Sequence, residues 1–348
     1  MVPGIQINDL VQRLLADAKS KKDYIVPATG VVLQDGERLS WGTESAPMTN
    51  HAMNQLSTYL GIPSRFVDRL RTDAPDLITA NVNRLLQTKK DDKRMIRTLH
   101  GKARSWQSDQ YRRLDHEDVA EKVLPMIQAA GYQITSANVT DSRLYIHTVS
   151  PRTEGEIRLN DPVRFGWIIG NSEIGLGSFY LQAFIDRLRC TNGMILPEFS
   201  KKRAHIGGRS DVMGDSYIVN VSSETQKAAD NALWSGVQDH IREFSTPAGI
   251  ARVMDRLKEQ ADAPVAGDPT AVIEALANKF VLREDESKSV LYSFLEQGDR
   301  TRWGLSNAIT QLANGMADYD RAVELERIGG ELLMTGTRDW KAIGSAVA

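Results

Sequence analysis

The sequence predicts an α+β fold with an antiparallel β-sheet core, flanked by N-terminal helices and followed by a helical C-terminal region. Three observations support this prediction: helical apolar spacing through residues 1–88, strand-like segments with turn residues through 89–221, and helical spacing again through 222–348. Helices and strands occur in blocks rather than in alternation, which favours α+β over a doubly wound sheet. We therefore expect three regions with these bounds.

The first region is expected to be mainly helical. Residues 1–22 form an amphipathic pattern without the apolar core of a signal peptide. A strand pair is expected over 30–42, because Asp35-Gly36 marks a tight turn. Three helices are expected next. Thr49 or Asn50 caps the first, which ends at Gly61, and the second starts at Pro63 and Ser64. The third lies within residues 74–87.

The middle region changes to strand periodicity. Residues 94–108 predict two strands interrupted at Gly101, and 115–131 predict a helix that Asp115 caps and Gly131 ends. Further strands within 132–150, 163–190 and 215–222 predict an antiparallel meander. The glycine-rich stretch 170–177 lies between two strands, so we expect a hairpin connection rather than a phosphate-binding loop.

The last region is expected to be helical from residue 222, with breaks near Pro247, at 262–270 and at 296–299. One helix within 301–315 places apolar residues at Trp303, Leu305 and Ile309, a spacing typical of a buried helix face.

Composition limits the functional classes. The 348 residues are 41% hydrophobic and 25% charged, as in ordinary globular proteins. No run of 18 apolar residues is present, so no membrane span is expected, and the one cysteine excludes an internal disulfide and fits a bacterial cytoplasm. Phosphate-loop, dinucleotide-binding, zinc-protease and serine-hydrolase motifs are missing. The histidines lack the spacing of zinc ligands; they are His51, His100, His116, His147, His205 and His240. We expect no cofactor and no metal.

Cys190 ends a strand whose side is partly apolar, so we interpret it as a small packed group. The alternative is a nucleophile whose thiol is activated by Arg187 and Arg189, with His205 as a partner in space.

Basic residues gather in two places. Residues 211–348 carry a net charge of −8 and residues 1–210 a net charge of +6. Residues 89–113 contain nine Lys and Arg against three Asp, together with Trp106 and Tyr111, and 201–209 contain no acidic residue. Cations bind phosphates and aromatic faces stack on unpaired bases, so this mixture suits single-stranded nucleic acid. The predicted contact residues are Arg104, Trp106, Tyr111, Arg112, Arg113, Arg187, Arg189, Lys201, Lys202, Arg203 and Arg209.

Three segments together resemble a known family. "ARSWQSDQYRRLDHEDV", "LRCTNGMI" and "TRWGLSNAITQLA" occur in this order, and the chain from about 45 to 335 resembles the phage and plasmid-like proteins of domain of unknown function 932. The resemblance implies an origin in a mobile element and a cytoplasmic setting, and it implies no activity.

The leading functional hypothesis is a non-enzymatic protein that binds single-stranded DNA or RNA, such as a strand-annealing recombination factor that forms a homo-oligomeric ring or filament. Two alternatives remain. A metal-dependent nuclease would need carboxylates to converge beside the basic clusters; the candidates are Asp109, Asp115, Asp161, Glu173 and Asp186. A phage structural or interaction protein would use the charges for assembly and would not bind nucleic acid. Trp106 is either a stacking residue or part of the core.

Overall fold

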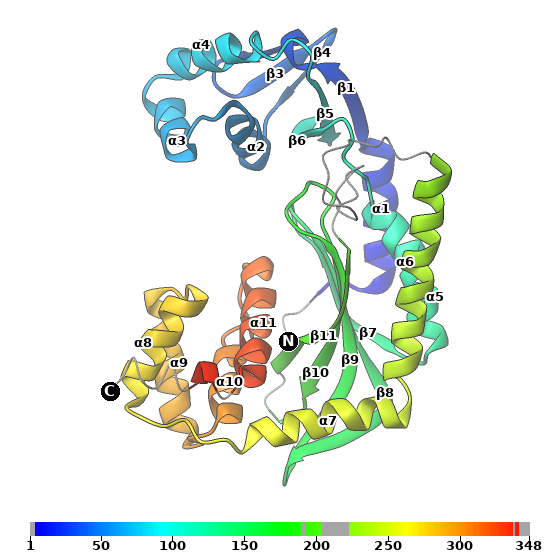
Figure 1. Ribbon diagram of the computed structural model, residues 1–348, viewed down its shortest axis with the longest axis vertical. Helices are drawn as coiled ribbons and strands as arrows, with labels where there is room; N and C mark the ends of the chain where they lie inside the picture. Colours follow the sequence, from blue (N-terminus) through cyan, green and yellow to red (C-terminus); the bar gives the residue numbers. More distant parts are fainter. Residues whose placement is uncertain (1–3, 190–191, 204–222, 337, 341–348) are drawn as a thin grey trace.

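The computed structural model describes residues 4–189, 192–203, 223–336 and 338–340, without the side chains of 152–154, 203, 223 and 226. Helices and antiparallel sheets are arranged in blocks along the chain (Figure 1), which confirms the predicted α+β class. An N-terminal helix leads into a small mixed module, a central antiparallel sheet follows, and helices complete the chain.

The N-terminal module, residues 22–108, contains two three-stranded antiparallel sheets and three α-helices. The strand orders are β1-β5-β6 and β2-β3-β4. The strands are β1 (Lys22–Pro27), β2 (Val31–Gln34), β3 (Arg38–Trp41), β4 (Glu44–Pro47), β5 (Lys93–Leu99) and β6 (Lys102–Ser108), and a 3₁₀ turn spans Ala28–Gly30. The helices are α2 (Asn50–Leu60), α3 (Ser64–Asp73) and α4 (Pro75–Leu86).

Local sequence signals explain the helix and turn boundaries in this module. Thr49 caps α2 by accepting a hydrogen bond from the backbone N–H of Ala52 at 3.2 Å, and Gly61 ends the helix with φ 74°. Asp35 and Gly36 both have positive φ, as a two-residue hairpin turn requires. These predicted boundaries are therefore confirmed.

The central sheet is an antiparallel meander, as predicted. Its strand order is β11-β10-β9-β8-β7, so each strand pairs with the next along the chain. The strands are β7 (Gln133–Val139), β8 (Leu144–Arg158), β9 (Asp161–Asn171), β10 (Phe179–Arg187) and β11 (Asn192–Arg203). The strand expected at 215–222 and Cys190 lie outside the described residues.

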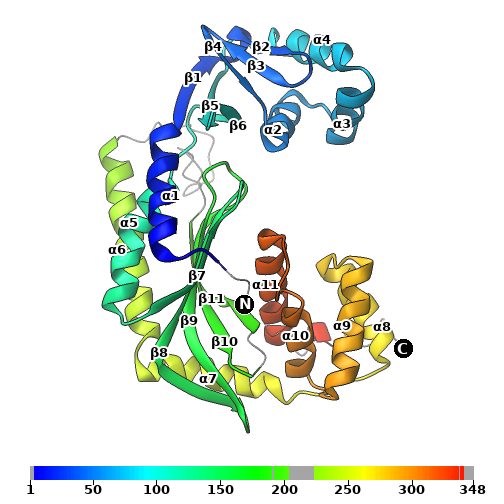
Figure 2. The same ribbon diagram turned by 180° about the vertical axis from the view of Figure 1, so that it is seen from behind.

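Helices cover both faces of this sheet, so its strands are buried on both sides (Figures 1 and 2). On β10, Phe179 and Leu181 face the core shared with α1 and α5–α7, while Tyr180 and Phe184 face the core shared with α8–α11. These helices are α1 (Ile7–Ser20), α5 (His116–Ala129), α6 (Ser223–Phe244), α7 (Pro247–Ala261), α8 (Pro269–Phe280), α9 (Glu284–Gln297), α10 (Arg302–Gln311) and α11 (Tyr319–Met334). Trp303 on α10 is buried, which confirms its predicted core role.

Close packing of α11 on β11 depends on a glycine. A Cβ on Gly330 would lie 1.7 Å from the carbonyl oxygen of Ile195, so any side chain there would push the helix off the strand. The C-terminal helices are thus held directly against the edge strand of the sheet.

The boundary predicted at residue 88, between the N-terminal region and the sheet core, does not separate the two sheets. β5 pairs with β1 from Lys22↔Thr98 to Pro27↔Lys93, so the hairpin 93–108 belongs to the N-terminal module rather than to the central sheet. Sequence periodicity indicated the hairpin but could not indicate its partner, since β1 lies about 70 residues earlier. β1 and β4 were also missed.

Within the described residues, no helix has both the length and the apolar composition needed to cross a membrane.

Candidate functional site

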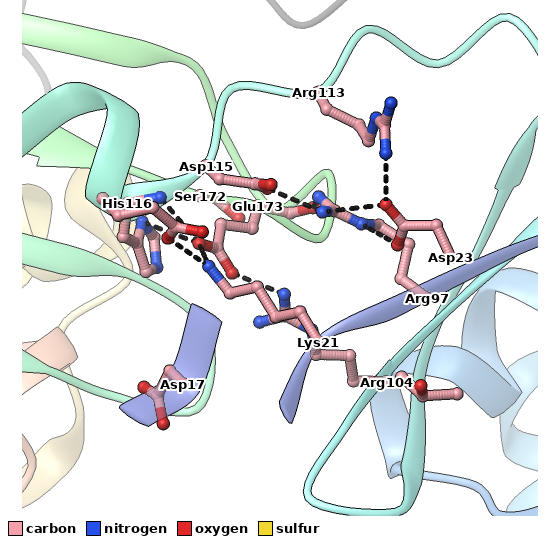
Figure 3. Close-up of polar contacts among 12 residues, drawn as sticks. Asp17, Lys21, Asp23, Arg97, Arg104, Arg113, Asp115, His116, Ser172 and Glu173 are labelled. Atoms are coloured by element: carbon pink, nitrogen blue, oxygen red, sulfur yellow. Dashed lines mark hydrogen bonds and ion pairs between the residues drawn. The ribbon is translucent and has the colours of Figure 1, made fainter. Parts of the chain in front are cut away.

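The segment between β9 and β10, residues 172–178, carries a buried carboxylate into the N-terminal module. Glu173 is 1% exposed. Its Oε1 accepts hydrogen bonds from Lys21 Nζ and, at 2.6 Å, from the backbone N–H of His116, while Oε2 lies 2.5 Å from Arg104 Nη2 (Figure 3). The partners come from the end of α1, the start of α5 and β6, so one carboxylate joins three separate parts of the chain.

The charges around Glu173 keep it ionised. Burial opposes ionisation, but the Arg104 guanidinium and the Lys21 ammonium outweigh it and hold the pKa of Glu173 well below its usual range. His116 is itself buried, which lowers its pKa to about 4, so the imidazole is neutral near pH 7. Lys21 and Arg104 therefore supply the positive charge that stabilises the Glu173 carboxylate.

A second buried cation completes this cluster. Arg97 is 0% exposed and donates to Asp23 Oδ1 at 2.8 Å and to Asp115 Oδ1 at 2.6 Å. Burial alone would lower the pKa of Arg97, but Asp115 and Asp23 outweigh burial and raise it. Arg97 Nη1 also donates to the backbone carbonyl of Glu173 at 2.7 Å. The junction network is thus Lys21, Asp23, Arg97, Arg104, Asp115, His116 and Glu173.

The glycine-rich stretch is a docking segment as well as the predicted hairpin connection. The carbonyl of Ile174 accepts three hydrogen bonds from the N-terminal module, from His51 Nε2 at 2.8 Å, Gln55 Nε2 at 2.9 Å and Gln107 Nε2 at 2.7 Å. Gly175 has φ 78°, and a Cβ there would lie 2.5 Å from Gln107 Nε2. A glycine is favoured because φ lies in the left-handed region, and another residue would also have to displace the Gln107 amide.

The junction network is therefore suited to holding the N-terminal module on the central sheet. Buried charges are tolerated when opposite charges compensate them, and each buried cation of this network faces a carboxylate. Arg104 Nη2 and Glu173 Oε2 form an ion pair without a hydrogen bond. A metal site requires several unpaired ligands, and no group of three or more His, Cys, Asp or Glu in the described part of the chain could hold one.

Four of the predicted phosphate-binding arginines are paired with carboxylates. Arg104 contacts Glu173, Arg112 Nη2 lies 2.6 Å from Asp230, Arg113 Nη1 lies 2.9 Å from Asp23, and Arg187 Nε lies 2.6 Å from Asp161. The partners of Arg112, Arg113 and Arg187 lie on α6, β1 and β9. Folding brings distant carboxylates to a segment that looks uniformly basic in the sequence. The prediction that Arg104 and Arg187 are available to phosphates is wrong, because both are largely enclosed.

Trp106 belongs to the core of the N-terminal module. It is 2% exposed and packs against Tyr59 with ring centroids 5.9 Å apart. Its predicted role in base stacking is wrong, because no base can reach a buried ring. Tyr111 is partly buried, and burial raises the pKa of its hydroxyl to about 12.

The second basic cluster is described only in part. Lys201 and Lys202 lie on β11 opposite Leu181 and Tyr180; Lys202 is exposed and Lys201 is partly buried. Arg189 is exposed. The side chain of Arg203 and all of Arg209 lie outside the described residues.

Of the carboxylates considered for a nuclease, Asp115 and Glu173 lie in the junction network, whereas Asp161 and Asp186 lie on the central sheet. Asp161 begins β9 and Glu173 follows its end, and ten residue steps at about 3.3 Å separate the strand ends by roughly 33 Å. Asp186 pairs with Arg164, and Asp115 pairs with Arg97. Asp109 contacts the hydroxyl of Ser108 at 3.3 Å. Four of these carboxylates thus face a cation and Asp109 faces a hydroxyl, and no three His, Cys, Asp or Glu of the described residues are grouped so as to hold a metal ion.

Two of the segments behind the family resemblance meet in space. Trp303 Nε1 donates to Asp161 Oδ2 at 2.7 Å, and the same carboxylate binds Arg187. Asn192 Nδ2 donates to Asn307 Oδ1 at 3.2 Å and to Thr310 Oγ1. This buried polar cluster ties α10 to the ends of β9–β11, so the motif residues described here have a structural role. The third segment contributes Asp115 to the junction network.

Sequence reasoning missed an exposed surface on α3 that carries two arginines and a phenylalanine, with Asp68 and Asp73 exposed on the same helix. Val67 and Leu70 bury one side of this helix, and Arg65, Phe66 and Arg69 are exposed; we call these three residues the α3 surface. Phe66 is 49% exposed. The signal was present as Arg65 and Arg69 at i,i+4 spacing with Phe66 three residues before Arg69, spacings that place side chains on neighbouring parts of a helix surface.

Comparisons of the chain with protein-family models, with curated proteins and with solved structures find no match. The resemblance to domain of unknown function 932 therefore stays a prediction that these comparisons do not test.

Proposed function

We propose that this protein binds single-stranded nucleic acid through its N-terminal module, with the α3 surface as a contact site. The observation that carries the proposal is an exposed aromatic ring between two exposed arginines, Arg65 and Arg69, on one helix. Arginines contact phosphates, and an exposed ring stacks on an unpaired base, so the combination favours single strands over duplexes.

The charge of the module supports the same proposal. Residues 22–108 contain 13 Lys and Arg against 9 Asp and Glu, a net charge of +4. Several of these cations are arginines paired with carboxylates inside the structure, but Lys90 is exposed in the turn before β5 and Lys93 is exposed at the first residue of β5. Arg69 contacts Asp73 at 3.3 Å with side chains 79% and 58% exposed, a pair that water screens and that a phosphate can displace.

A second exposed aromatic residue provides a matched control. Phe66 and Tyr292 are the aromatic side chains that are more than one-third exposed among the described residues, at 49% and 69%. Tyr292 lies on α9, whose first turn carries Glu284, Asp285 and Glu286. An acidic helix repels phosphates, so Tyr292 should be exposed without contributing to binding.

Fluorescence anisotropy with labelled single-stranded and double-stranded oligonucleotides over a salt series tests the proposal. Replacing Arg65 and Arg69 with Ala removes two phosphate contacts and should make the slope of log affinity against log salt shallower by about 1.4, at ~0.7 per phosphate. Phe66→Ala should weaken binding by roughly 1–3 kcal/mol with little change in slope.

The controls are Tyr292→Ala and the double variant Lys258→Ala with Lys279→Ala, which remove an exposed ring and two exposed cations from the C-terminal helices. Both should bind like the parent. If the α3 variants bind with the affinity and salt slope of the wild-type protein, the binding site lies elsewhere. If the wild-type protein has no salt-dependent affinity for single strands, the proposed function is refuted.

A further inference from the structure

A hydrogen-bonded chain of Asp17, His100 and Ser20 lies where the end of α1 meets the turn between β5 and β6. Ser20 Oγ is 3.0 Å from His100 Nδ1, and His100 Nε2 is 2.8 Å from Asp17 Oδ1. The order is hydroxyl, imidazole and carboxylate, as in the triads that activate a serine nucleophile, with the roles of the two ring nitrogens exchanged.

The hydrogen bonds of Asp17, His100 and Ser20 indicate which atoms carry the protons. Asp17 is a buried carboxylate that accepts a hydrogen bond, so it selects the imidazole tautomer with a proton on Nε2 and leaves Nδ1 as an acceptor. Ser20 Oγ accepts a hydrogen bond from the backbone N–H of His100 at 2.7 Å. The hydroxyl proton of Ser20 is therefore directed at Nδ1, the atom that would remove it.

The backbone at His100 adds a second observation. His100 has φ 48° and Gly101 has φ 74°, both in the left-handed region of a tight hairpin turn. Glycine or asparagine meets this requirement more easily than histidine does. A histidine held in this conformation points to a role for its side chain.

Ser20 also lines a small cavity of about 250 Å³ between β1 and β4, together with Lys22, Tyr24, Trp41 and Glu44. Its volume is below the roughly 300 Å³ at which pockets for drug-sized ligands begin, so it fits a small acyl group. The buried indole N–H of Trp41 has no hydrogen-bond partner among the described residues. Trp41 and the Lys22 ammonium are the donors that the lining offers to an oxyanion.

We propose that Ser20 is the nucleophile of a second activity, the hydrolysis of small carboxylic esters, with His100 as general base and Asp17 as the residue that positions it. Ser20 Oγ forms a bond to the ester carbonyl carbon while its proton moves to His100 Nδ1. The bond from that carbon to the alcohol oxygen breaks, and the alcohol leaves with the proton. Water then attacks the acyl-serine with His100 again accepting the proton, which returns to Ser20 as the acid is released.

Reaction of the full-length wild-type protein with a fluorophosphonate probe, followed by peptide mapping, tests the proposal. Covalent label on Ser20, and a burst of p-nitrophenol from p-nitrophenyl acetate, are the expected results. Ser20→Ala should abolish both, and Ser289→Ala, which removes an exposed serine on α9 outside this cavity, should leave both unchanged. Mapping on the wild-type chain does not depend on whether a variant folds.

Two further variants separate catalysis from a structural contact. His100→Gly suits the left-handed turn and should slow labelling about 100-fold or more, and added imidazole should restore part of the rate. Asp17→Asn should slow labelling of Ser20 and the nitrophenol burst in parallel. A wild-type protein without label on Ser20, or a His100→Gly variant that reacts at the parental rate, would mean that the chain only ties the turn to α1.

Discussion

Replacing Glu173 with Gln should destabilise the attachment of the N-terminal module. The substitution keeps the size of the side chain and removes the charge that faces Lys21 and Arg104, both 8% exposed. Breaking a buried ion pair by removing one partner costs roughly 3–5 kcal/mol. Lys21 keeps a second carboxylate, Glu117, so Arg104 is the cation left without compensation, and we expect the lower end, about 3 kcal/mol.

Urea unfolding followed by tryptophan fluorescence measures this loss. Glu121→Gln is the matched control, because Glu121 lies on α5 with a side chain 74% exposed and should change the free energy of unfolding by less than about 0.5 kcal/mol. A Glu173→Gln variant within about 1 kcal/mol of the control would refute the reasoning that buried charge pairing holds this junction.

The contribution of Glu173 to the free energy of unfolding should depend on pH. The pKa of Glu173 is depressed in the folded protein, so its contribution is fully present above the unfolded pKa of about 4.3 and is lost as pH falls below that value. The difference between wild type and Glu173→Gln should therefore stay constant from pH 7 to about pH 5.5 and shrink at lower pH.

Three further predictions concern burial and pairing. The pKa of His116 falls from 6.5 to about 4 on folding, so the unfolded chain binds a proton first on acidification. Wild type should lose about 3 kcal/mol between pH 6.5 and pH 4 that His116→Gln does not lose, measured by urea unfolding across pH. Trp106→Ala should cost roughly 3–5 kcal/mol by thermal or urea unfolding and leave the salt slope of nucleic-acid binding unchanged; a changed slope would contradict its core position. Asp161→Asn removes the carboxylate charge that Arg187 and the Trp303 indole share and should cost about 3 kcal/mol, and a neutral effect on the melting temperature would count against that cluster.

The parts of the fold that sequence could predict are those fixed within a few residues. Thr49 and Gly61 bound α2, Asp115 caps α5, and Asp35-Gly36 turns a hairpin, because a cap or a positive φ depends only on the neighbouring backbone. The meander was predictable for the same reason, since each of its strands pairs with the next along the chain.

The parts that sequence could not predict depend on distant partners. β1 was missed because its pairing partner β5 lies about 70 residues later, and that pairing places the basic hairpin in the N-terminal module. The candidate site changed for the same reason. The cations around Trp106 predicted a stacking residue, but Trp106 is buried. Phe66, which was not among the predicted contact residues, is exposed.

The sequence by itself thus determined the α+β class, most helix and turn boundaries and the excess of positive charge in the first part of the chain. Only the tertiary structure decided which of those charges meet solvent. Glu173 reaches Lys21 across 152 positions and Arg97 reaches Asp23 across 74, so a locally basic segment becomes neutral inside the fold. The physical reason is that burying a charge is unfavourable without an opposite charge, and the chain supplies that partner from wherever folding brings it near.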